Sequence, residues 1–479
     1  MTTYRKRPWS LRFLLPLLAV MALLAAACGS SDDAAEEADA DETSTEETET
    51  ADEEAEADEE EAVEEDDGDP EGVEPDTSGV IALEWMTRPD NTEEADVYAA
   101  ISDELSGTLD GLELTYTPGS NEGTGYQQTL LTNLSAGTAP DVFWIPGTDI
   151  ADFASRGVIL DLREFADEAG HNDADFFPGP MGHLTTELET GQPGNALWGL
   201  PRDVSTFGIY LNLDLIAEAG ADNPIELAAN GEWTWDAFNQ VTADVAALGD
   251  EIAGYGQSNW WGPNGAWLNA AGGGFFNDDR TACALDDASS IAGLTFLRDL
   301  FATGNAVPFG EDPEPPFRAG TVGMFQNGRW ATPGIRTVDF TWDVVGLPEG
   351  PEGPGNWLFW GAYVVNADTD DPAAAFQLVQ ALTEAGVQAQ ISELGANIPS
   401  RVSDEALDAF LGFTPPENNQ AFLDGLTNNP TTEGPLWAGS WPEFDSIAGS
   451  EIGAVVSGDR DLADFEANIC SETESAFGG

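Results

Sequence analysis

The stretch VIALEW at residues 80–85 begins an alternation of strand-like and helix-like segments that decides the expected fold. A helix-like stretch at 93–105 follows, and then a strand-like stretch at 112–116 in which apolar and polar residues alternate. A second helix at about 126–135 leads to the strand-like DVFWI at 141–145. Strands that alternate with helices of about 10–15 residues predict βαβ units and a mostly parallel sheet. The expected fold class is therefore α/β.

Further helix starts are spread along the rest of the chain. Thr234 has the position of an N-cap before Trp235, and Asp371 precedes a proline that would open an Ala-rich helix ending near residue 383. Near the C-terminus, 444–456 and 462–474 are expected to be helical. The 401 residues from 79 to 479 are more than one core usually holds, so they predict two α/β lobes.

The charge of the chain excludes several kinds of partner. Asp and Glu number 89 against 15 Lys and Arg, and the formal net charge is −74. A nucleic-acid backbone or an anionic lipid surface needs clustered basic residues, so neither is an expected partner. With two histidines and three cysteines, neither a metal nor another cofactor is expected. An acidic surface almost without lysine suggests adaptation to saline surroundings. The alternative explanation of this composition is simple high solubility.

The first 28 residues predict export from the cytoplasm. Basic residues at 5–12 precede an apolar stretch, 13–27, that is too short for a comfortable membrane span. The run LAAAC at 24–28 resembles a bacterial lipobox, in which cleavage leaves the cysteine, here Cys28, as an acylated N-terminus. Ala25 stands where leucine is most common. An ordinary signal peptide with an incidental cysteine is the alternative.

Residues 29–78 form a separate segment by composition. They contain 26 Asp or Glu, no basic residue and no aromatic residue. Such a segment cannot bury enough apolar surface to offset the entropy cost of ordering, so disorder is expected. It would serve as a tether between the lipid anchor and the folded body. An acidic interaction tail is the alternative.

Short motifs along nearly all of 79–479 point to a known family. In chain order they are GTAPDV at 137–142, LP at 200–201 with YLNLDL at 210–215, EWTWD at 232–236, FRAGTVGM at 317–324 with GRW at 328–330, GAYVVN at 361–366, and DP at 371–372 with PSR at 399–401. Together they resemble the extracellular sugar-binding proteins of bacterial ABC importers, the group that includes maltose-binding protein. Gly323 stands where that family usually has alanine.

The resemblance implies a two-lobed, periplasmic-binding-protein-like fold with a ligand cleft between the lobes. Three crossover strands are expected near 204–210, 344–348 and 364–367. The first lobe would comprise 79–205 plus 347–365, and the second 206–346 plus 366–479. The resemblance also implies a monomer that lies outside the cytoplasm, is held at the cell membrane by its lipid anchor, binds a carbohydrate and delivers it to an ABC permease.

A sugar site needs flat aromatic surfaces together with carboxylates, amides or arginine for the hydroxyl groups. Trp330 matches a position at which the family stacks on ligand, and Trp260 and Trp261 are adjacent on a Gly/Asn-rich loop, where both cannot face one core. For each tryptophan, packing in the core is the alternative. The aromatic candidates are Trp85, Trp144, Trp260, Trp261, Trp330, Trp360 and Trp441. Trp198, Trp233, Trp235 and Trp342 are assigned to the core, and Trp437 lies where the family often adds an aromatic residue.

The polar candidates are next to the same motifs. Asp149 follows the strand at 141–145 and could accept a hydroxyl group, cap a helix at 150–156, or do both. Arg202 and Asp203 flank the first expected crossover, and Arg329 precedes Trp330. In a chain so poor in basic residues, an arginine beside a cleft motif is more informative than another carboxylate.

Four further residues have simpler expectations. His171 and His183 lack a third metal-ligand motif and are expected on the surface or in loops. Cys283 and Cys470 are expected to form a disulfide, because thiols outside the cytoplasm tend to be oxidised. Two free buried thiols are the alternative.

Two other functions compete with sugar binding. The same fold could bind a polyamine, which would suit the acidity and the tryptophans. A secreted glycoside hydrolase would use a carboxylate pair, but in so acidic a chain such pairs are uninformative. Neither a G-x-S-x-G nor an H-E-x-x-H motif occurs. The ordered family motifs also favour binding over hydrolysis, so no enzymatic activity is expected.

Overall fold

The computed structural model describes residues 79–477 except 90–91, 121–124 and 429–430. The expected signal peptide at 1–28, with Cys28, and the acidic segment 29–78 lie outside the described residues, so the predictions made for them stay predictions. No helix of the described part is both long enough and apolar enough to cross a membrane.

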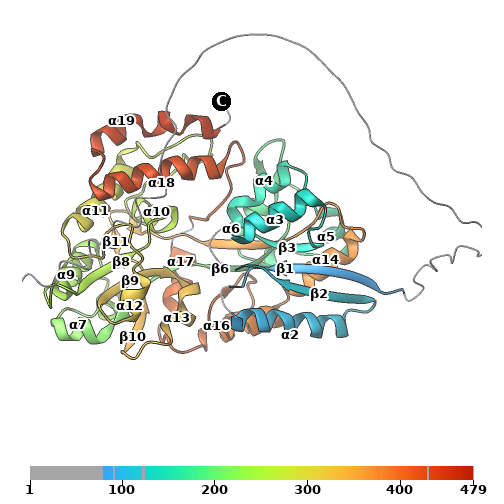
Figure 1. Ribbon diagram of the computed structural model, residues 1–479, viewed down its shortest axis with the longest axis horizontal. Helices are drawn as coiled ribbons and strands as arrows, with labels where there is room; N and C mark the ends of the chain where they lie inside the picture. Colours follow the sequence, from blue (N-terminus) through green and yellow to red (C-terminus); the bar gives the residue numbers. More distant parts are fainter. Residues whose placement is uncertain (1–78, 90–91, 121–124, 429–430, 478–479) are drawn as a thin grey trace, which may run out of the picture. The chain divides into compact units, whose positions relative to one another are not determined.

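Six strands form the first sheet, in the order β14-β6-β13-β3-β1-β2. Figure 1 labels β1, β2, β3 and β6 among them. Their bounds are β1 Ile81–Thr87, β2 Leu112–Pro118, β3 Val142–Pro146, β6 Leu200–Ser205, β13 Phe359–Val365 and β14 Ile398–Pro399. β1 is parallel to β2 and β3, as the βαβ pattern predicts. β13 is antiparallel to β3 and β6, because it returns from the second sheet and does not follow a βαβ crossover. The sheet is therefore mixed and not mostly parallel.

The helices around the first sheet pack against it and contribute to its hydrophobic core. They are α2 Thr92–Thr108, α3 Gly125–Ala136, α4 Ile150–Ser155, α5 Arg163–Ala169, α6 Pro178–Leu184, α14 Pro372–Leu382, α15 Ala385–Ser392 and α16 Asp404–Leu411. Tyr98 and Ile101 of α2 pack into the same buried cluster as Leu83 and Phe143 of the strands. The spacing of the two α2 residues puts both on one face of the helix.

Four strands form the second sheet, in the order β10-β7-β9-β8. They are β7 Phe207–Asn212, β8 Ala253–Gln257, β9 Val322–Gly328 and β10 Trp342–Val345. The helices of this part are α7 Leu213–Ala219, α8 Pro224–Ala229, α9 Trp235–Ala246, α10 Trp261–Ala270, α11 Ala288–Ala302, α12 Glu314–Arg318, α13 Thr332–Ile335, α17 Gln420–Asn428, α18 Trp441–Ser457 and α19 Leu462–Glu472. Along β7, Ile209 and Leu211 join one buried cluster and Tyr210 joins the other, as the alternation of a strand requires.

The short segments complete the described secondary structure. Two small hairpins pair β4 Thr186–Glu187 with β5 Gln192–Pro193 and β11 Glu349–Gly350 with β12 Gly353–Pro354. Four 3₁₀ turns are η1 Gly147–Asp149, η2 Asp173–Asp175, η3 Arg329–Ala331 and η4 Glu474–Phe477. Thr234 caps α9 as expected, since its hydroxyl accepts the backbone N–H of Ala237 at 3.4 Å. Asp371 precedes α14, but its side chain makes no capping hydrogen bond.

Two of the expected crossovers lie where the sequence puts them. The chain leaves the first sheet at the end of β6 and enters the second at Phe207, and it returns between β10 and β13. The third expectation, at 364–367, is wrong. Val364 and Val365 are fully buried in β13 and pair with β3 of the first sheet. The chain instead passes back to the second sheet after α16, where α17 packs against β7.

The expected lobe boundary after residue 365 is therefore also wrong. β14 belongs to the first sheet, α14 packs against β13, β3 and β6, and α15 and α16 pack against β14. Residues 366–411 accordingly belong with the first lobe and not the second. Helices α18 and α19, at the red end of the colour scale in Figure 1, pack against α10 and α11 and belong with the second lobe.

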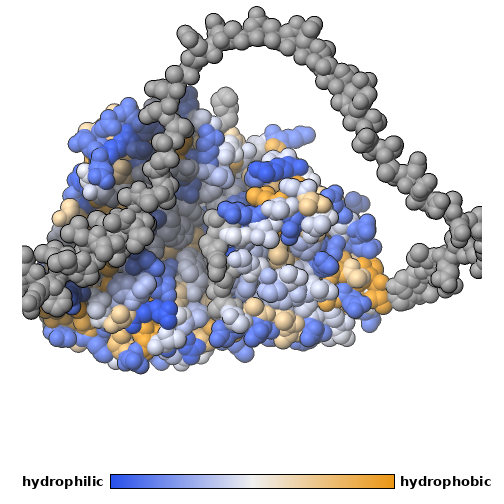
Figure 2. All heavy atoms as spheres, in the orientation of Figure 1, coloured by the Kyte–Doolittle hydropathy of each residue, from blue (hydrophilic) through white to orange (hydrophobic). Residues whose placement is uncertain are grey.

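A disulfide joins Cys283 to Cys470, with an S–S distance of 2.06 Å and a Cα–Cα distance of 5.3 Å. Cys470 lies on α19, and Cys283 lies in the loop before α11. The bond thus fixes that loop to the C-terminal helices of the second lobe. Hydrophilic residues dominate the face seen in Figure 2, with smaller hydrophobic patches between them.

Candidate functional site

A cavity of about 450 Å³ lies between the two sheets. In α/β proteins ligands bind in crevices outside the ends of strands. This cavity is lined by β3, β6 and β13 of the first sheet and by β9 and the segment after β8 of the second. The lining residues are Arg88, Gln127, Trp144, Pro146, Thr148, Arg202, Asp203, Val204, Ser205, Ser258, Trp260, Trp261, Asn327, Trp330, Phe359, Trp360, Gly361, Asn397 and Glu433.

Five tryptophans give the cavity its apolar surface. The ring centroids of Trp260 and Trp330 are 6.4 Å apart, and Phe359 lies 5.7 Å from the first and 5.4 Å from the second. The planes of Trp260 and Trp261 are 89° apart, so the two indoles present different surfaces. The stretch after Trp260 is helix α10 and not the expected loop. The cavity therefore offers several aromatic faces to a ligand.

Glycines make room for these indoles. A Cβ atom on Gly328 would collide with the six-membered ring of Trp330, and one on Gly361 would collide with the indole of Trp144. The indoles of Trp360 and Trp260 pass over Gly147 and Gly262 in the same way. Each large ring thus occupies space that a Cβ atom would otherwise fill, which helps to fix its position at the cavity wall.

Arg202 and Asp203 form a buried ion pair on β6. Nη2 of Arg202 is 2.6 Å from Oδ2 of Asp203, and Nε donates to the same oxygen at 2.8 Å. Nη1 donates to the hydroxyl of Thr87 at 2.9 Å and to the carbonyl of Arg88 at 3.0 Å. The guanidinium carbon lies 4.8 Å from the ring centre of Trp144. The pair is therefore fixed by the protein, and it puts a hydrogen-bond donor and an acceptor at the cavity wall.

Glu433 is the second carboxyl group of the cavity and is 6% exposed. Its Oε2 accepts the backbone N–H of Trp360 at 3.3 Å, and its carbonyl accepts Nε1 of Trp360 at 2.8 Å. Burial raises the pKa of Glu433 to about 8, with nearby Asp149 raising it too, while Arg280 lowers it. At neutral pH its carboxyl group is mostly protonated, so it can donate a hydrogen bond as well as accept one.

Asp149 lies beside the cavity but does not line it. It occupies the N-cap position of α4 without a side-chain capping hydrogen bond, and the hydroxyl of Thr148 donates to its Oδ1 at 3.3 Å. Burial raises the pKa of Asp149 to about 6. Its neighbour Thr148 reaches the cavity instead, so the structure favours neither of the two roles expected for Asp149.

Two polar atoms at the cavity wall lack a hydrogen-bond partner among the described residues, Nε1 of Trp144 and Oε1 of Gln127. Buried polar atoms are usually paired. A ligand with hydroxyl groups could supply an acceptor to the first and a donor to the second.

Three sequence candidates are not at the cavity. Trp85 is fully buried in β1, and its indole N–H donates to the hydroxyl of Ser102 at 3.0 Å. Trp441 is buried at the start of α18, and its ring packs edge-on against Trp261 with centroids 5.2 Å apart. Both side chains are occupied by core packing, and contrary to expectation neither lines the cavity.

Arg329 is the third correction. Its side chain is fully buried, with Nη1 donating to Oδ1 of Asn419 and the guanidinium carbon lying 4.8 to 5.4 Å from three phenylalanine rings. Burial lowers the pKa of Arg329 to about 10. The aromatic rings are Phe410, Phe413 and Phe422, which lie about 80 to 95 residues further along the chain. Arg329 thus points into the core, while the next residue, Trp330, lines the cavity.

Seven sequence candidates do meet at the cavity: Trp144, Arg202, Asp203, Trp260, Trp261, Trp330 and Trp360. Arg88 and Glu433 are lining residues that sequence reasoning missed. Arg88 directly follows β1, so the rule that ligands bind at strand ends could have found it. Nothing in the sequence around Glu433 signals a site.

The four tryptophans assigned to the core do pack there, whereas one histidine differs from the expectation. Trp198, Trp233 and Trp342 are buried, and half-buried Trp235 stacks on Phe296 with centroids 4.0 Å apart. His183 is not a surface or loop residue: it lies on α6, and burial lowers its pKa to about 3. The described residues contain no group of three or more His, Cys, Asp or Glu side chains arranged to hold a metal ion.

Comparison with known proteins agrees with this architecture. A protein of Brucella abortus (strain 2308) described as a binding protein is 22% identical over 345 residues, which cover 69% of this chain and 78% of that protein. The galactooligosaccharide-binding protein of Bacillus subtilis is 23% identical over 257 residues, covering 51% and 56%. The fold is similar to that of an ABC substrate-binding protein from Listeria monocytogenes solved with cycloalternan, with a TM-score of 0.70, 19% identity, and 83% and 99% coverage.

The family assignment rests on a match that covers more than half of the chain. Residues 107–410 match the family described as bacterial extracellular solute-binding protein. These residues include β3, β6, β9 and β13, which line the cavity from both sheets. The chain belongs to the bacterial extracellular solute-binding protein family.

Proposed function

We propose that this chain is a lipid-anchored, extracytoplasmic binding protein that captures a saccharide in the cavity between the sheets and delivers it to an ABC permease. The observation that carries the proposal is the lining of the cavity. Five indoles surround a fixed Arg202–Asp203 pair and the carboxyl group of Glu433. Aromatic faces suit the C–H faces of a sugar ring, and the polar groups suit its hydroxyls.

The charge of the lining favours a neutral ligand over a polyamine. The lining contains two arginines, Arg88 and Arg202, and two carboxyl groups, those of Asp203 and Glu433. Its net charge is therefore not negative, even if both carboxyl groups are ionised. A polyamine carries several positive charges and would need an excess of carboxylates. The Bacillus subtilis relative is named for galactooligosaccharide binding, and the Listeria monocytogenes neighbour was solved with cycloalternan. Both support a saccharide.

Delivery to a permease would depend on the fact that residues of both lobes line the cavity. A ligand in this cavity touches residues from both lobes, so it stabilises the arrangement in which they are close together. A permease that recognises this arrangement would receive only loaded protein. On this account the protein acts as a monomer, and its ligand leaves chemically unchanged.

A thermal-shift panel with the purified protein tests the proposal. Neutral mono- and oligosaccharides should raise the unfolding temperature, whereas spermidine and putrescine should not. Chromatography of the incubated sugars should recover them unchanged. A stabilising polyamine without any stabilising saccharide would contradict the ligand class, and a cleaved glycoside would support the hydrolase alternative.

A further inference from the structure

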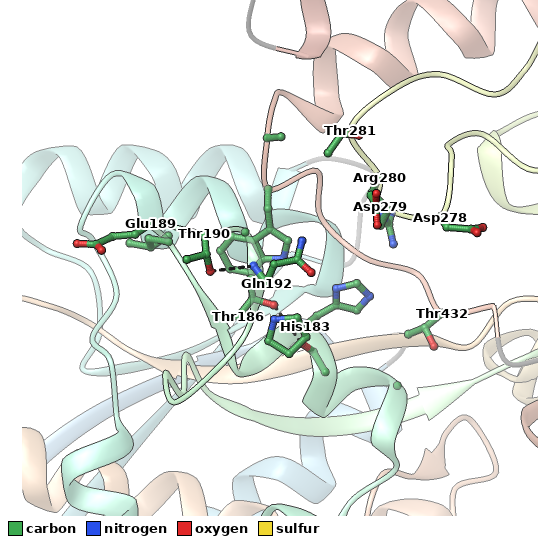
Figure 3. Close-up of a pocket in the computed structure, with 17 residues that line it drawn as sticks. His183, Thr186, Glu189, Thr190, Gln192, Asp278, Asp279, Arg280, Thr281 and Thr432 are labelled. Atoms are coloured by element: carbon green, nitrogen blue, oxygen red, sulfur yellow. Dashed lines mark hydrogen bonds between the residues drawn. The ribbon is translucent and has the colours of Figure 1, made fainter.

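A second cavity, of about 430 Å³, shares no lining residue with the first (Figure 3). One wall comes from α6 and the β4–β5 hairpin, which lie between elements of the first sheet. The opposite wall is the loop 278–281 of the second lobe, and residues 432 and 437–438 complete it. In Figure 3, Thr190, Gln192 and His183 lie on one side, with Arg280, Asp279 and Thr281 on the other.

Arg280 is held firmly at this cavity. It has a φ of 54°, and no other non-glycine residue among those described has a positive φ. Its Nη2 donates to the carbonyl of Gly434 at 2.7 Å, and its guanidinium carbon lies 5.2 Å from the ring centre of Phe276. A non-glycine residue with a positive φ persists only where its surroundings enforce it, and such residues cluster at ligand sites. The nearby disulfide at Cys283 fixes the same loop.

Two buried N–H groups at the cavity lining are unpaired. Nε of Arg280 and Nε1 of Trp437 have no hydrogen-bond partner among the described residues. His183 is neutral at physiological pH, because burial and then Arg280 lower the pKa of its imidazole. A neutral imidazole carries one donor and one acceptor nitrogen. The lining therefore combines unpaired donors with a neutral ring of mixed hydrogen-bonding character.

The other lining groups fit a polyhydroxylated ring. Trp437 supplies an aromatic surface, Thr190, Thr281 and Gln192 supply hydroxyl and amide groups, and Asp279 lies beside Arg280. This is the combination that a saccharide requires, an apolar face with fixed hydrogen-bonding groups around it. We propose that the cavity between the β4–β5 hairpin and the loop 278–281 is a second saccharide-binding site. It rests on the proposed function, because the first cavity must also take a saccharide.

A stacked pair of rings separates the two cavities. The imidazole of His183 lines the second cavity and the indole of Trp360 lines the first, with ring centroids 6.1 Å apart and planes 10° from parallel. Thr432 of the second cavity is next to Glu433 of the first. A saccharide ring in the second cavity could therefore be a further unit of the chain bound in the first, or a separate molecule.

Calorimetric titration of the full-length protein tests this site. The probes are galacto- and malto-oligosaccharides of one to six units. The variant Trp437→Ala removes the aromatic surface, and Gln192→Ala removes an exposed side chain whose loss should not disturb folding. Gln390→Ala, an exposed glutamine of α15 away from both cavities, is the matched control. Trp330→Ala reports on the first cavity.

Two results support the second site. If it binds a further unit of one chain, Trp437→Ala and Gln192→Ala should weaken only the longer saccharides, by roughly tenfold, with one ligand per protein. If it binds a separate molecule, wild type should take up two ligands, and the two variants should lose one. Saccharide binding that depends on Trp330 but is the same in Trp437→Ala, Gln192→Ala and Gln390→Ala would overturn the second site alone. Absence of saccharide binding by the wild type would overturn the proposed function and this site with it.

Discussion

The imidazole of His183 lies parallel to the indole of Trp360, and each ring lines a different cavity. Nε1 of Trp360 also donates to the carbonyl of Glu433, whose carboxyl group accepts the backbone N–H of Trp360. Trp360 is thus fixed on several sides. The wall between the cavities is a preformed part of the protein, and a ligand need not order it on binding.

Gly328 should be required for binding but not for folding. Its φ of −78° and ψ of 176° suit alanine, yet a Cβ atom there would collide with the ring of Trp330. Gly328→Ala should therefore displace the indole and weaken saccharide binding by roughly tenfold, as measured by calorimetry. Gly386→Ala on α15, where a Cβ atom meets nothing within 4 Å, is the control and should bind as wild type does. Equal affinities in both variants would show that the position of this indole does not matter.

The pH dependence of stability should show that the carboxyl group of Glu433 is protonated in the folded protein at neutral pH. Burial raises its pKa from 4.5 to about 8, so folding favours the protonated form. Its contribution to stability is complete below about pH 4.5 and is lost as the pH rises through 8. In Glu433→Gln this loss cannot occur, so its unfolding temperature should fall less than that of wild type between pH 5 and 9. Asp149, with a pKa of about 6, titrates in both proteins, so the difference between them reports on Glu433 together with its coupling to Asp149.

The measurement is thermal unfolding of wild type and Glu433→Gln between pH 5 and 9. Parallel curves for wild type and Glu433→Gln would mean that Glu433 is ionised in the folded protein at neutral pH, and that it cannot donate a hydrogen bond to a ligand.

The disulfide should stabilise the second lobe. The two cysteines are separated by 187 residues, for which chain entropy gives an upper figure of about 5 kcal/mol in the free energy of unfolding. A reductant should lower the unfolding temperature of wild type and leave that of a Cys283→Ser, Cys470→Ser double variant unchanged. If wild type is insensitive to a reductant that demonstrably opens the bond, the stabilising role is refuted.

Cys28 should be the acylated N-terminus of the mature protein. Two or more acyl chains anchor a protein stably, whereas one is marginal. Mass spectrometry of membrane-extracted protein should therefore find a lipidated N-terminal cysteine, and Cys28→Ser should be released from the membrane. Retention of the variant, or a mature N-terminus at another residue, would refute the anchor.

The sequence correctly predicts cavity-lining residues where a family motif or strand end coincides with a side chain that suits a sugar. Trp144 is near the end of a strand-like segment, Trp260 follows one, and Trp330 is part of a family motif; all three line the cavity. Arg329 was expected there because it is next to Trp330, but both lie in a 3₁₀ turn, in which successive side chains point in different directions. The aromatic rings around Arg329 come from residues 410–422, so its burial depends on distant contacts that local sequence does not reveal.

The errors in the lobe assignment have a similar origin. β14 is only two residues long, Ile398 and Pro399, yet it pairs with β6 of the first sheet. Helices α15 and α16 pack against β14 and therefore belong with that sheet. Such a short strand has no periodicity to detect. Glu433 reaches the cavity through a segment whose backbone pairs with Leu358, again a long-range contact. Element types were predictable from local pattern, whereas these pairings depend on the complete fold.

The measurement that most directly tests saccharide binding between the sheets is calorimetric titration of Trp330→Ala beside Trp267→Ala. Trp330 is partly exposed at the cavity, whereas Trp267 is buried in the core of the second lobe. Trp330→Ala should weaken binding by roughly 1–3 kcal/mol with a small loss of stability. Trp267→Ala should lose about 3–5 kcal/mol of stability while any folded protein keeps its affinity. Unchanged saccharide affinity in Trp330→Ala, together with much lower stability, would contradict the account.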